Sequence, residues 1–345
     1  MSKKIKLGIS VGDINGIGME VIIKTFQDSR MLDICIPIVY GSSKVSSFHR
    51  KVLQINDFSF NIIKSAKEAN LKKPNIIDCW NEDVEITLGQ SNEVGGKYAL
   101  ASLEAATEGL KNGDIDALVT APINKENIQS ETFKFPGHTE YLTDKFEGNS
   151  LMLMVNDNLK IGVATNHIPL SKVANTLTAD TIFGKLKILN KALIQDFCIT
   201  SPRIAVLGLN PHAGDNGLIG KEEEDIIIPA IDNAKSIGIN TFGPYPADGF
   251  FGSGNYQKFD AILAMYHDQG LIPFKALSFG EGTNFTAGLN IIRTSPDHGV
   301  AYEIAGQNKA EESSFRQAVY AACDIYKNRA FAAEINENPL PLAKK

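Results

Sequence analysis

The chain of 345 residues is longer than one hydrophobic core usually supports, so its length predicts two domains or two lobes. A hydrophobic fraction of 43% and a charged fraction of 21% are ordinary for a globular protein and argue against a disordered chain. The net charge of −6, from 34 basic and 40 acidic residues scattered along the chain, indicates no general affinity for nucleic acid or for an anionic membrane.

Short apolar runs alternate with longer helical patterns, which is typical of a doubly wound α/β protein. A first strand is expected at Leu7–Val11, and the turn Gly12–Gly18 leads from it into a helix that starts near Met19. The next expected elements are a strand at Ile36–Tyr40, a helix at Gly95–Lys111, a strand at Ala117–Thr120, and a strand pair, Leu151–Val155 and Ile161–Ala164, around a turn at Asn156–Asn158.

The second half continues this alternation. Its expected elements are a helix at Ala179–Phe197, a strand at Ile204–Leu209, a helix at Glu222–Ser236, strands at Ala261–Met265 and Gly288–Ile292, and a closing helix at Glu312–Arg329. No run of about 18 apolar residues predicts a membrane span, and the apolar stretch after the basic Met1–Lys6 is too short for a secretion signal. The four cysteines lie far apart and form no CxxC pair. Reduced thiols and a cytoplasmic location are therefore expected.

Three of the six histidines, His167, His212 and His267, follow apolar strand candidates. Because ligands of α/β sheets bind beyond the carboxyl ends of strands, the three imidazoles could converge on one metal ion. Three neutral nitrogen ligands favour zinc, cobalt or nickel over magnesium, and an added oxygen ligand from Asp248 or Asp268 would weaken that preference. The alternative is three separate hydrogen-bonded histidines near the surface.

Two further segments suit an anionic ligand. After the turn Pro136-Gly137, His138 and Thr139 are expected to open a helix whose free N–H groups could bind an anion, although Thr139 could equally be an ordinary N-cap. The stretch Phe274–Arg293 supplies Lys275, the glycine-rich loop Gly280–Asn284 and Arg293. A solvated surface loop would explain Lys275, but it explains less well an arginine just past a buried strand.

Several common nucleotide and hydrolase signatures are missing. The segment Gly12–Gly18 contains three glycines, but its spacing is not GxGxxG, so it is a weak dinucleotide signal. No Walker A pattern, GxSxG elbow or HExxH motif occurs.

Taken together, these segments resemble the 4-hydroxythreonine-4-phosphate dehydrogenase family of pyridoxal 5'-phosphate biosynthesis. The resemblance runs from Gly8 to about Ala322. One departure is Ile14, where the family usually has a proline after the acidic residue, and this change affects a turn. The matching blocks are Val119–Lys125, Pro136–Glu140, Asn210–Gly214, Gly243–Asp248, Tyr266–Gly270 and Arg293–Ala301.

The resemblance implies an α/β fold like that of isocitrate and isopropylmalate dehydrogenases, with two α/β/α lobes and the active site in the cleft between them. The first lobe is expected to contain residues 1–137 and 276–345, and the second residues 138–275. The second lobe is the expected dimerisation lobe, because the family forms homodimers whose metal ligands cross the subunit interface.

The implied reaction is the NAD-dependent oxidation and β-decarboxylation of 4-phosphohydroxy-L-threonine to 3-amino-2-oxopropyl phosphate. The resemblance implies a divalent metal on His167, His212 and His267, with zinc expected and cobalt or magnesium as alternatives. Asp248, Asp268 and Lys275 are candidates for proton handling, and the sequence does not rank them. The implied substrate contacts are His138, Thr139, Lys275, Asn284 and Arg293, and the implied adenosine segment contains His298, Gly299, Ile304 and Gly306.

Other functions stay open at this stage. A sister enzyme acting on threonate 4-phosphate or erythronate 4-phosphate would carry the same metal and phosphate motifs. A metal-dependent hydrolase or lyase without nicotinamide, or a phosphate-binding protein without catalysis, are the alternatives of other classes. The sequence does not decide between NAD and NADP.

Overall fold

The computed structural model describes residues 4–337, which divide into two compact units. The first unit contains the described residues of Met1–Gly148 and Ser278–Cys323, and the second contains those of Asn149–Leu277 and Asp324–Lys345. Helix α5 (His138–Lys145) belongs to the first unit. The units therefore do not begin and end where the expected lobes do, which were to meet after residue 137 and after residue 275.

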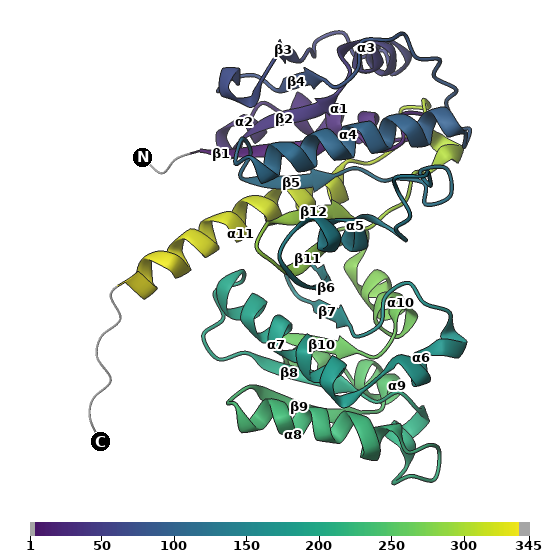
Figure 1. The fold of residues 1–345 in the computed structure, drawn as a ribbon, viewed down its shortest axis with the longest axis vertical. Coiled ribbons are helices and arrows are strands. Elements are labelled where there is room, and N and C mark those ends of the chain that lie inside the picture. Colours follow the sequence, from purple (N-terminus) through teal and green to yellow (C-terminus); the bar gives the residue numbers. More distant parts are fainter. Residues whose placement is uncertain (1–3, 338–345) are drawn as a thin grey trace. The chain divides into compact units, whose positions relative to one another are not determined.

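The sheet of the first unit has the strand order β3-β4-β2-β1-β5-β12-β11 (Figure 1). All pairs are parallel except the last, in which β11 runs antiparallel to β12. The strands are β1 (Ile5–Ser10), β2 (Cys35–Gly41), β3 (Asn61–Ile63), β4 (Asn75–Asp78), β5 (Ala117–Thr120), β11 (Thr283–Leu289) and β12 (Arg293–Pro296).

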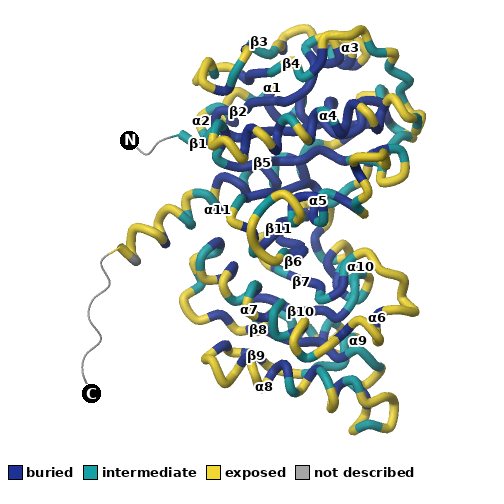
Figure 2. Tube along the Cα trace, in the orientation of Figure 1, coloured by how far each residue is buried: buried dark blue, intermediate teal, exposed yellow. Residues whose placement is uncertain are grey.

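Strands β1, β2 and β5 consist almost wholly of buried residues, which is expected of parallel strands covered on both faces (Figure 2). Helix α4 (Glu93–Lys111) packs on these three strands. It begins where the Asn92 side chain accepts a hydrogen bond from the backbone N–H of Gly95. The other helices that begin in this unit are α1 (Gly18–Gln27), α2 (Met31–Ile34), α3 (Ser43–Val52) and α11 (Ser313–Glu337).

The sheet of the second unit has the strand order β6-β7-β10-β8-β9. The expected hairpin is confirmed: β6 and β7 are antiparallel, and the Asn156 side chain accepts hydrogen bonds from the backbone of Asn158 and Leu159 in the turn. The remaining pairs are parallel. The strands are β6 (Gly148–Val155), β7 (Lys160–Val163), β8 (Arg203–Leu207), β9 (Asn240–Tyr245) and β10 (Ala261–Ala264).

Helices cover this second sheet (Figure 1). Phe250 of α9 (Ala247–Gly252) and Phe274 of α10 (His267–Ser278) are buried in one apolar cluster with side chains of β7, β8 and β10. Helices α7 (Ala179–Gln195) and α8 (Ile228–Ser236) pack against each other and against β10 and β9 respectively. A π-helical turn at Glu223–Ile227 precedes α8, inside the helix expected at Glu222–Ser236. The short helix α6 (Val173–Thr176) follows β7.

The strand expected at Gly288–Ile292 is wrong. Strand β11 ends at Leu289, and Ile291 and Ile292 lie in the turn before β12. Ile292 is buried in that turn and Ile291 packs against the core, so their apolar character reflects burial of a turn and not a strand period. Arg293 consequently opens strand β12 instead of following an apolar strand.

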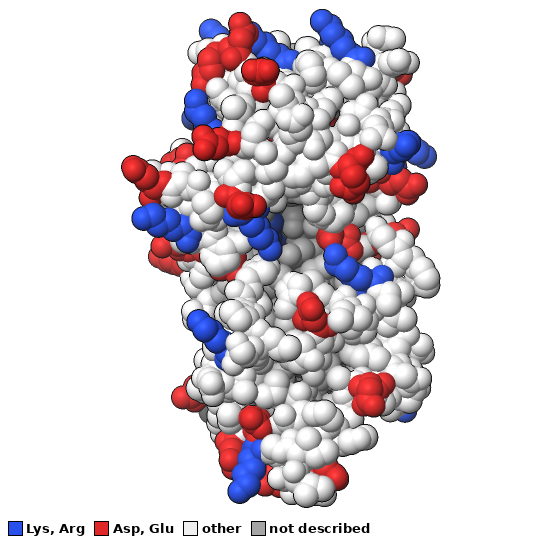
Figure 3. Space-filling model, turned by 90° about the vertical axis from the view of Figure 1, so that its right-hand side faces the viewer, with Lys and Arg blue, Asp and Glu red and all other residues white. Residues whose placement is uncertain are grey.

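No helix among residues 4–337 is both long and apolar enough to cross a bilayer. Acidic and basic side chains are interspersed on the face drawn in Figure 3, as the scattered charges of the sequence predict. All four cysteines are free: Cys35 and Cys323 are buried, Cys79 is half-buried and Cys198 is exposed.

Candidate active site

The three histidines His167, His212 and His267 follow three neighbouring strands of the second unit. Strand β10 lies between β7 and β8 and is parallel to both, so the carboxyl ends of the three strands lie at one edge of the sheet. His167 follows β7, His212 follows β8, and His267 begins α10 shortly after the end of β10. The sheet topology therefore brings the three residues to the same edge, as the strand assignment predicts.

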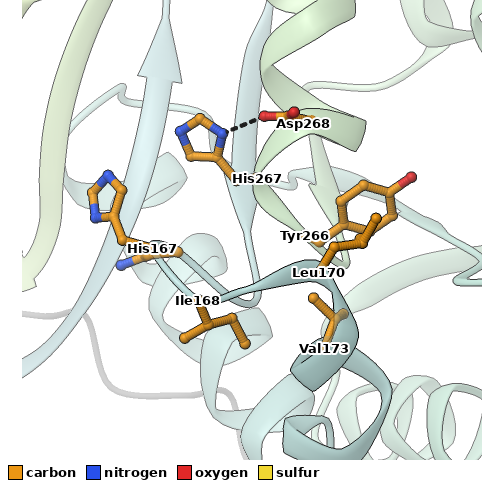
Figure 4. A pocket seen from close by; sticks show the side chains of 8 residues that line it. His167, Ile168, Leu170, Val173, Tyr266, His267 and Asp268 are labelled. Atoms are coloured by element: carbon orange, nitrogen blue, oxygen red, sulfur yellow. Dashed lines mark hydrogen bonds and ion pairs between the residues drawn. The ribbon is translucent and has the colours of Figure 1, made fainter.

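His167 and His267 line one pocket of about 440 Å³ (Figure 4). The centroids of their rings are 5.6 Å apart, with an angle of 45° between the ring planes. Nδ1 of His267 lies 2.7 Å from Oδ1 of Asp268, and this contact orients the imidazole and leaves its Nε2 for a ligand. The pocket is completed by Asn166, Ile168, Leu170, Val173 and Tyr266.

His212 lies one strand away from this pair, in the short 3-10 turn Pro211–Gly214. Its backbone is left-handed, with a φ of 54°. It is not among the residues that line the pocket of His167 and His267. Within residues 4–337 no group of three or more His, Cys, Asp or Glu side chains is close enough to hold a metal ion.

The donor chemistry nevertheless suits a divalent metal. Uncharged imidazole nitrogens at strand ends are ligands that zinc and cobalt prefer. Asn166, beside His167, has a buried Oδ1 for which the described residues offer no hydrogen-bond partner. The residues fit a metal in kind, and two of the three predicted ligands lie together in this chain.

The candidates for proton handling differ in position. Asp268 lines the pocket and contacts His267. Asp248 lies exposed in the first turn of α9, outside the pocket lining, and Lys275 lies exposed near the end of α10. The structure thus places Asp268 beside His267, whereas Asp248 lies on α9, which packs against the turn that carries His212.

Arg293, one of the predicted substrate contacts, has a buried guanidinium in the first unit. Arg293 is only 3% exposed. Its Nε and Nη2 donate to Oγ1 of Thr120 over 3.0 and 2.7 Å, and its Nη1 donates to Oγ1 of Thr286 over 3.2 Å. Burial lowers the pKa of Arg293 to about 9, while the carboxylate of Glu140 opposes that shift. A buried cation held by two hydroxyls is prepared to bind an anion.

His138 and Asn284 present unsatisfied polar atoms in the same unit. Nε2 of His138 and Oδ1 of Asn284 are enclosed and have no hydrogen-bond partner among the described residues. Burial lowers the pKa of His138 well below its usual range, and the positive charges of Arg293 and Lys125 lower it further. His138 is therefore neutral near pH 7. Buried polar atoms without partners are rare, and a ligand with polar groups would satisfy both.

Helix α5 begins at His138, as predicted, and Thr139 lies in its first turn. The hydroxyl of Thr139 is 3.5 Å from that of Thr286, which also binds Arg293. Gly137 precedes the helix without a side-chain cap. Thr139 therefore belongs, with Thr120, Thr286 and His138, to the group of side chains around Arg293, called here the Arg293 cluster, and it is not the N-cap of α5.

The segment expected to border adenosine also lies in the first unit. Nδ1 of His298 donates to the carbonyl of Gly299 over 2.9 Å, and its Nε2 is buried without a partner among the described residues. Gly306 has a φ of 75°, and a Cβ there would lie 2.6 Å from Cδ1 of Leu88. Ile304 lies between His298 and Gly306 in the sequence and is the last residue of the 3-10 turn Tyr302–Ile304.

A buried carboxylate missed by the sequence analysis supports this segment. Asp13 is 0% exposed, and its Oδ2 accepts hydrogen bonds from the Tyr302 hydroxyl over 2.6 Å and from Nδ2 of Asn127 over 2.7 Å. Its Oδ1 accepts from the backbone N–H of Asn15 over 2.9 Å. The only signal in the sequence was an acidic residue within the turn Gly12–Gly18. Thr120 and Thr286, which hold Arg293, carried no distinguishing signal.

Comparison with solved structures defines the fold class. An isocitrate dehydrogenase from Methylococcus capsulatus aligns with a TM-score of 0.51 and 11% identity, over 96% of this chain and 88% of that one. At this identity the likeness shows the fold alone. The chain has an α/β fold like that of isocitrate dehydrogenases, as expected.

Closer relatives define the family. The model of the pyridoxal phosphate biosynthetic protein PdxA matches residues 33–322. A protein of Bacteroides thetaiotaomicron named 4-hydroxythreonine-4-phosphate dehydrogenase is 52% identical over 339 residues, which is 98% of this chain and 93% of that protein. The solved 4-hydroxythreonine-4-phosphate dehydrogenase of Klebsiella pneumoniae aligns with a TM-score of 0.79 and 32% identity, over 94% of this chain and 100% of that one. The chain belongs to the PdxA family, and the resemblance found in its motifs is confirmed.

One relative carries a different substrate in its name. A protein of Oceanobacillus iheyensis, provisionally named D-threonate 4-phosphate dehydrogenase, is 38% identical over 94% of this chain and 99% of its own length.

Proposed function

We propose that this chain is a dehydrogenase that oxidises and β-decarboxylates 4-phosphohydroxy-L-threonine, with NAD as oxidant and a divalent metal as cofactor. The product is 3-amino-2-oxopropyl phosphate, a precursor of pyridoxal 5'-phosphate. The observation that carries the proposal is the 52% identity, over nearly the whole chain, with a relative named for this substrate. A nicotinamide cofactor is general to dehydrogenases of this family, whereas NAD and the metal are our specific assignments.

The Arg293 cluster supports binding of an anionic substrate. Its buried guanidinium supplies charge, while His138 and Asn284 supply polar atoms that lack partners among the described residues. We assign this cluster and Asn284 to the anionic groups of the substrate. Lys275 is assigned to the substrate by the resemblance alone, because it lies exposed on α10.

The histidines of the second unit support binding of the metal. His167, His212 and His267 would hold it, and a divalent cation there would supply positive charge that lowers the pKa of the substrate hydroxyl. We propose that the protein is a homodimer whose subunits share these ligands, because one chain gathers only two of the three. The free cysteines support a reducing compartment, and we propose the cytoplasm.

The proton chemistry falls to residues near the metal ligands. Oxidation moves a hydride from the substrate carbon to the nicotinamide and a proton from its hydroxyl to a base. Loss of CO2 from the resulting β-keto acid then requires a proton donor at the carbon that held the carboxylate. Asp268 is the best-placed of the three candidates, because it alone lines the pocket of His167 and His267. Asp248 and Lys275 remain candidates by resemblance.

A sister activity is the second candidate function. The relative provisionally named for D-threonate 4-phosphate matches this chain nearly end to end, although at lower identity than the first relative. The two substrates share a phosphate and a carboxylate and differ in the group beside the carboxylate. The Arg293 cluster would accept either substrate, so its geometry does not discriminate between them.

A comparison of substrates tests the proposal. The purified protein is supplied with NAD and zinc, and kcat/KM is measured by NADH absorbance for 4-phosphohydroxy-L-threonine, D-threonate 4-phosphate and D-erythronate 4-phosphate. We expect the highest kcat/KM with the first substrate, because the relative that is 52% identical over nearly the whole chain is named for it. A preference for threonate 4-phosphate or erythronate 4-phosphate would instead assign the second candidate function to the enzyme. No NADH with any substrate would refute the dehydrogenase assignment.

A further inference from the structure

Glu223 is a buried acidic residue beside the loop that carries His212. It is 2% exposed and opens the π-helical turn Glu223–Ile227. Single π-helical turns are rare, and those that do occur are frequently found at functional sites. A buried carboxylate is costly unless hydrogen bonds compensate for the water it has lost. The partners of Glu223 therefore show what the residue does.

Those partners lie in the segment directly before His212. Oε1 of Glu223 accepts hydrogen bonds from the backbone N–H groups of Leu209 and Asn210, both over 2.7 Å. Its Oε2 accepts a third from Nδ2 of Asn210 over 2.9 Å. The same amide nitrogen donates to Oε2 of Glu222 over 2.7 Å. One side chain thus fixes the backbone that leads from β8 to the histidine.

The backbone of this loop needs such support. His212, Ala213, Asp215 and Asn216 have φ values of 54°, 52°, 44° and 54°. Residues other than glycine rarely adopt this left-handed conformation, and four such residues so close together persist only where surrounding contacts enforce them.

The Glu223 carboxylate fits beside this loop because two of the neighbouring residues are glycines without a Cβ. A Cβ at Gly214 would lie 2.6 Å from Oε2 of Glu223. A Cβ at Gly208 would lie 2.9 Å from Cα of Ala213 and 3.1 Å from Oε1 of Glu223. The backbone of the loop therefore packs tightly against the Glu223 carboxylate both at Gly208 and at Gly214.

Gln269 connects the same loop to the segment that leads from β10 to His267. Its Nε2 donates to the carbonyl of Gly208 over 2.6 Å, and its Oε1 accepts from the backbone N–H of Met265 over 2.7 Å. Met265 directly follows β10, shortly before His267. Movement of the loop at Gly208 would therefore disturb the segment that leads to His267 as well.

We propose that Glu223 is a positioning residue for the metal ligand His212. It acts through the backbone of Leu209 and Asn210, and it makes no contact with the substrate. The inference rests on the proposed function, since it assumes that His212 binds a metal. It predicts that the affinity for the metal depends on a carboxylate that is not itself a ligand.

The test is a cobalt titration of metal-free full-length protein, followed by visible absorption, with the variant Glu223→Gln. Glutamine keeps the size of the side chain, but its amide nitrogen would face Nδ2 of Asn210, donor against donor. We expect a dissociation constant for cobalt about 10- to 100-fold higher than that of the unmodified protein, and a shifted absorption band. The matched control is Glu224→Gln, the next residue, which is exposed and should leave the constant within about twofold.

Circular dichroism establishes that each variant is folded. Should Glu223→Gln fail to fold, Glu223→Asp takes its place, because it keeps the charge and withdraws the carboxylate from the loop. Unchanged cobalt affinity and absorption in a folded Glu223 variant would overturn the inference and leave the proposed function standing. An unmodified protein that binds no cobalt, or a His212→Ala variant that binds it normally, would overturn the metal assignment and the inference together.

Discussion

The Tyr302 hydroxyl donates a 2.6 Å hydrogen bond to the carboxylate of Asp13, a residue 289 positions earlier in the chain. The bond joins the turn after β1 to the segment expected to border adenosine. Burial and the Asp13 carboxylate raise the pKa of Tyr302 to about 12, so the phenol remains a donor at every physiological pH.

Loss of this donor should destabilise the first unit. In Tyr302→Phe the carboxylate of Asp13 keeps its bonds from Asn15 and Asn127 but loses its phenol partner. We expect the free energy of unfolding to fall by about 1–3 kcal/mol, the usual cost of an unmet buried polar group. Urea denaturation measures this change in the free energy of unfolding. Tyr256→Phe is the control, because among residues 4–337 the Tyr256 hydroxyl only accepts a 3.4 Å bond from its neighbour Gln257. Equal stability of the two variants would contradict the role given to Asp13.

Two glycine substitutions in helices should act in opposite directions. A Cβ at Gly95 in α4 would lie 2.5 Å from Oδ1 of Asp13, whereas a Cβ at Gly184 in α7 would meet no atom within 4 Å. We expect Gly95→Ala to destabilise the protein by about 1–3 kcal/mol through overpacking. Gly184→Ala should stabilise it by about 0.5–1 kcal/mol through helix propensity. Thermal unfolding of both variants provides the comparison, and a stable Gly95→Ala protein would show that the Asp13 turn is not held tightly.

A buried histidine should make the protein sensitive to acid. Burial lowers the pKa of His49 to about 4, and its Nε2 donates to the carbonyl of Ile14 over 2.8 Å. The unfolded chain binds a proton at this residue near pH 6.5, while the folded protein does not until about pH 4. Stability from this group is therefore present above pH 6.5 and is lost as the pH falls toward 4, with a slope of up to about 1.4 kcal/mol per pH unit.

The variant His49→Gln tests this account. Glutamine can still donate to Ile14 but does not titrate. Urea denaturation between pH 7 and pH 4 should show a weaker pH dependence in the variant than in the unmodified protein. If both proteins lose stability with the same slope, the acid sensitivity comes from other groups.

Replacement of Arg293 should impair use of the substrate. In Arg293→Lys a single ammonium cannot reproduce the planar set of bonds to Thr120 and Thr286 and also bind an anion. We expect kcat/KM to fall about 10- to 100-fold, since one hydrogen bond to a charged group contributes about 1.5–3 kcal/mol. Steady-state kinetics measure the loss. The matched control is Arg30→Lys at an exposed ion pair with Asp28, and comparable losses in the two variants would remove Arg293 from the site.

The sequence was most informative where burial and periodicity agree. Strands such as β1 and β5 are buried along almost their whole length, so their apolar runs are recognisable. Strand β9 was missed because it lies at the end of its sheet, is largely exposed and contains Pro244. Strand β12 was missed because its residues Arg293–Pro296 are mostly polar although all four are buried.

Some residues of the candidate site could likewise be predicted from the sequence, and others could not. His167 and His267 could be placed together because each follows a recognisable strand, and neighbouring parallel strands end at one edge. The partners of Arg293 could not be predicted, because Thr120 and Thr286 are ordinary strand residues that only the sheet order β5-β12-β11 brings together. Asp13 and Tyr302 likewise meet only through the fold.

We propose that the protein couples metal-dependent oxidation of 4-phosphohydroxy-L-threonine to its decarboxylation. The most direct test gives metal-stripped protein this substrate, labelled at the carboxylate, with NAD, and then adds zinc, cobalt or magnesium. We expect no NADH before the metal is added, and NADH and labelled CO2 in equal amounts afterwards. Equal rates with and without metal would contradict the metal assignment, and NADH without CO2 would contradict the decarboxylation.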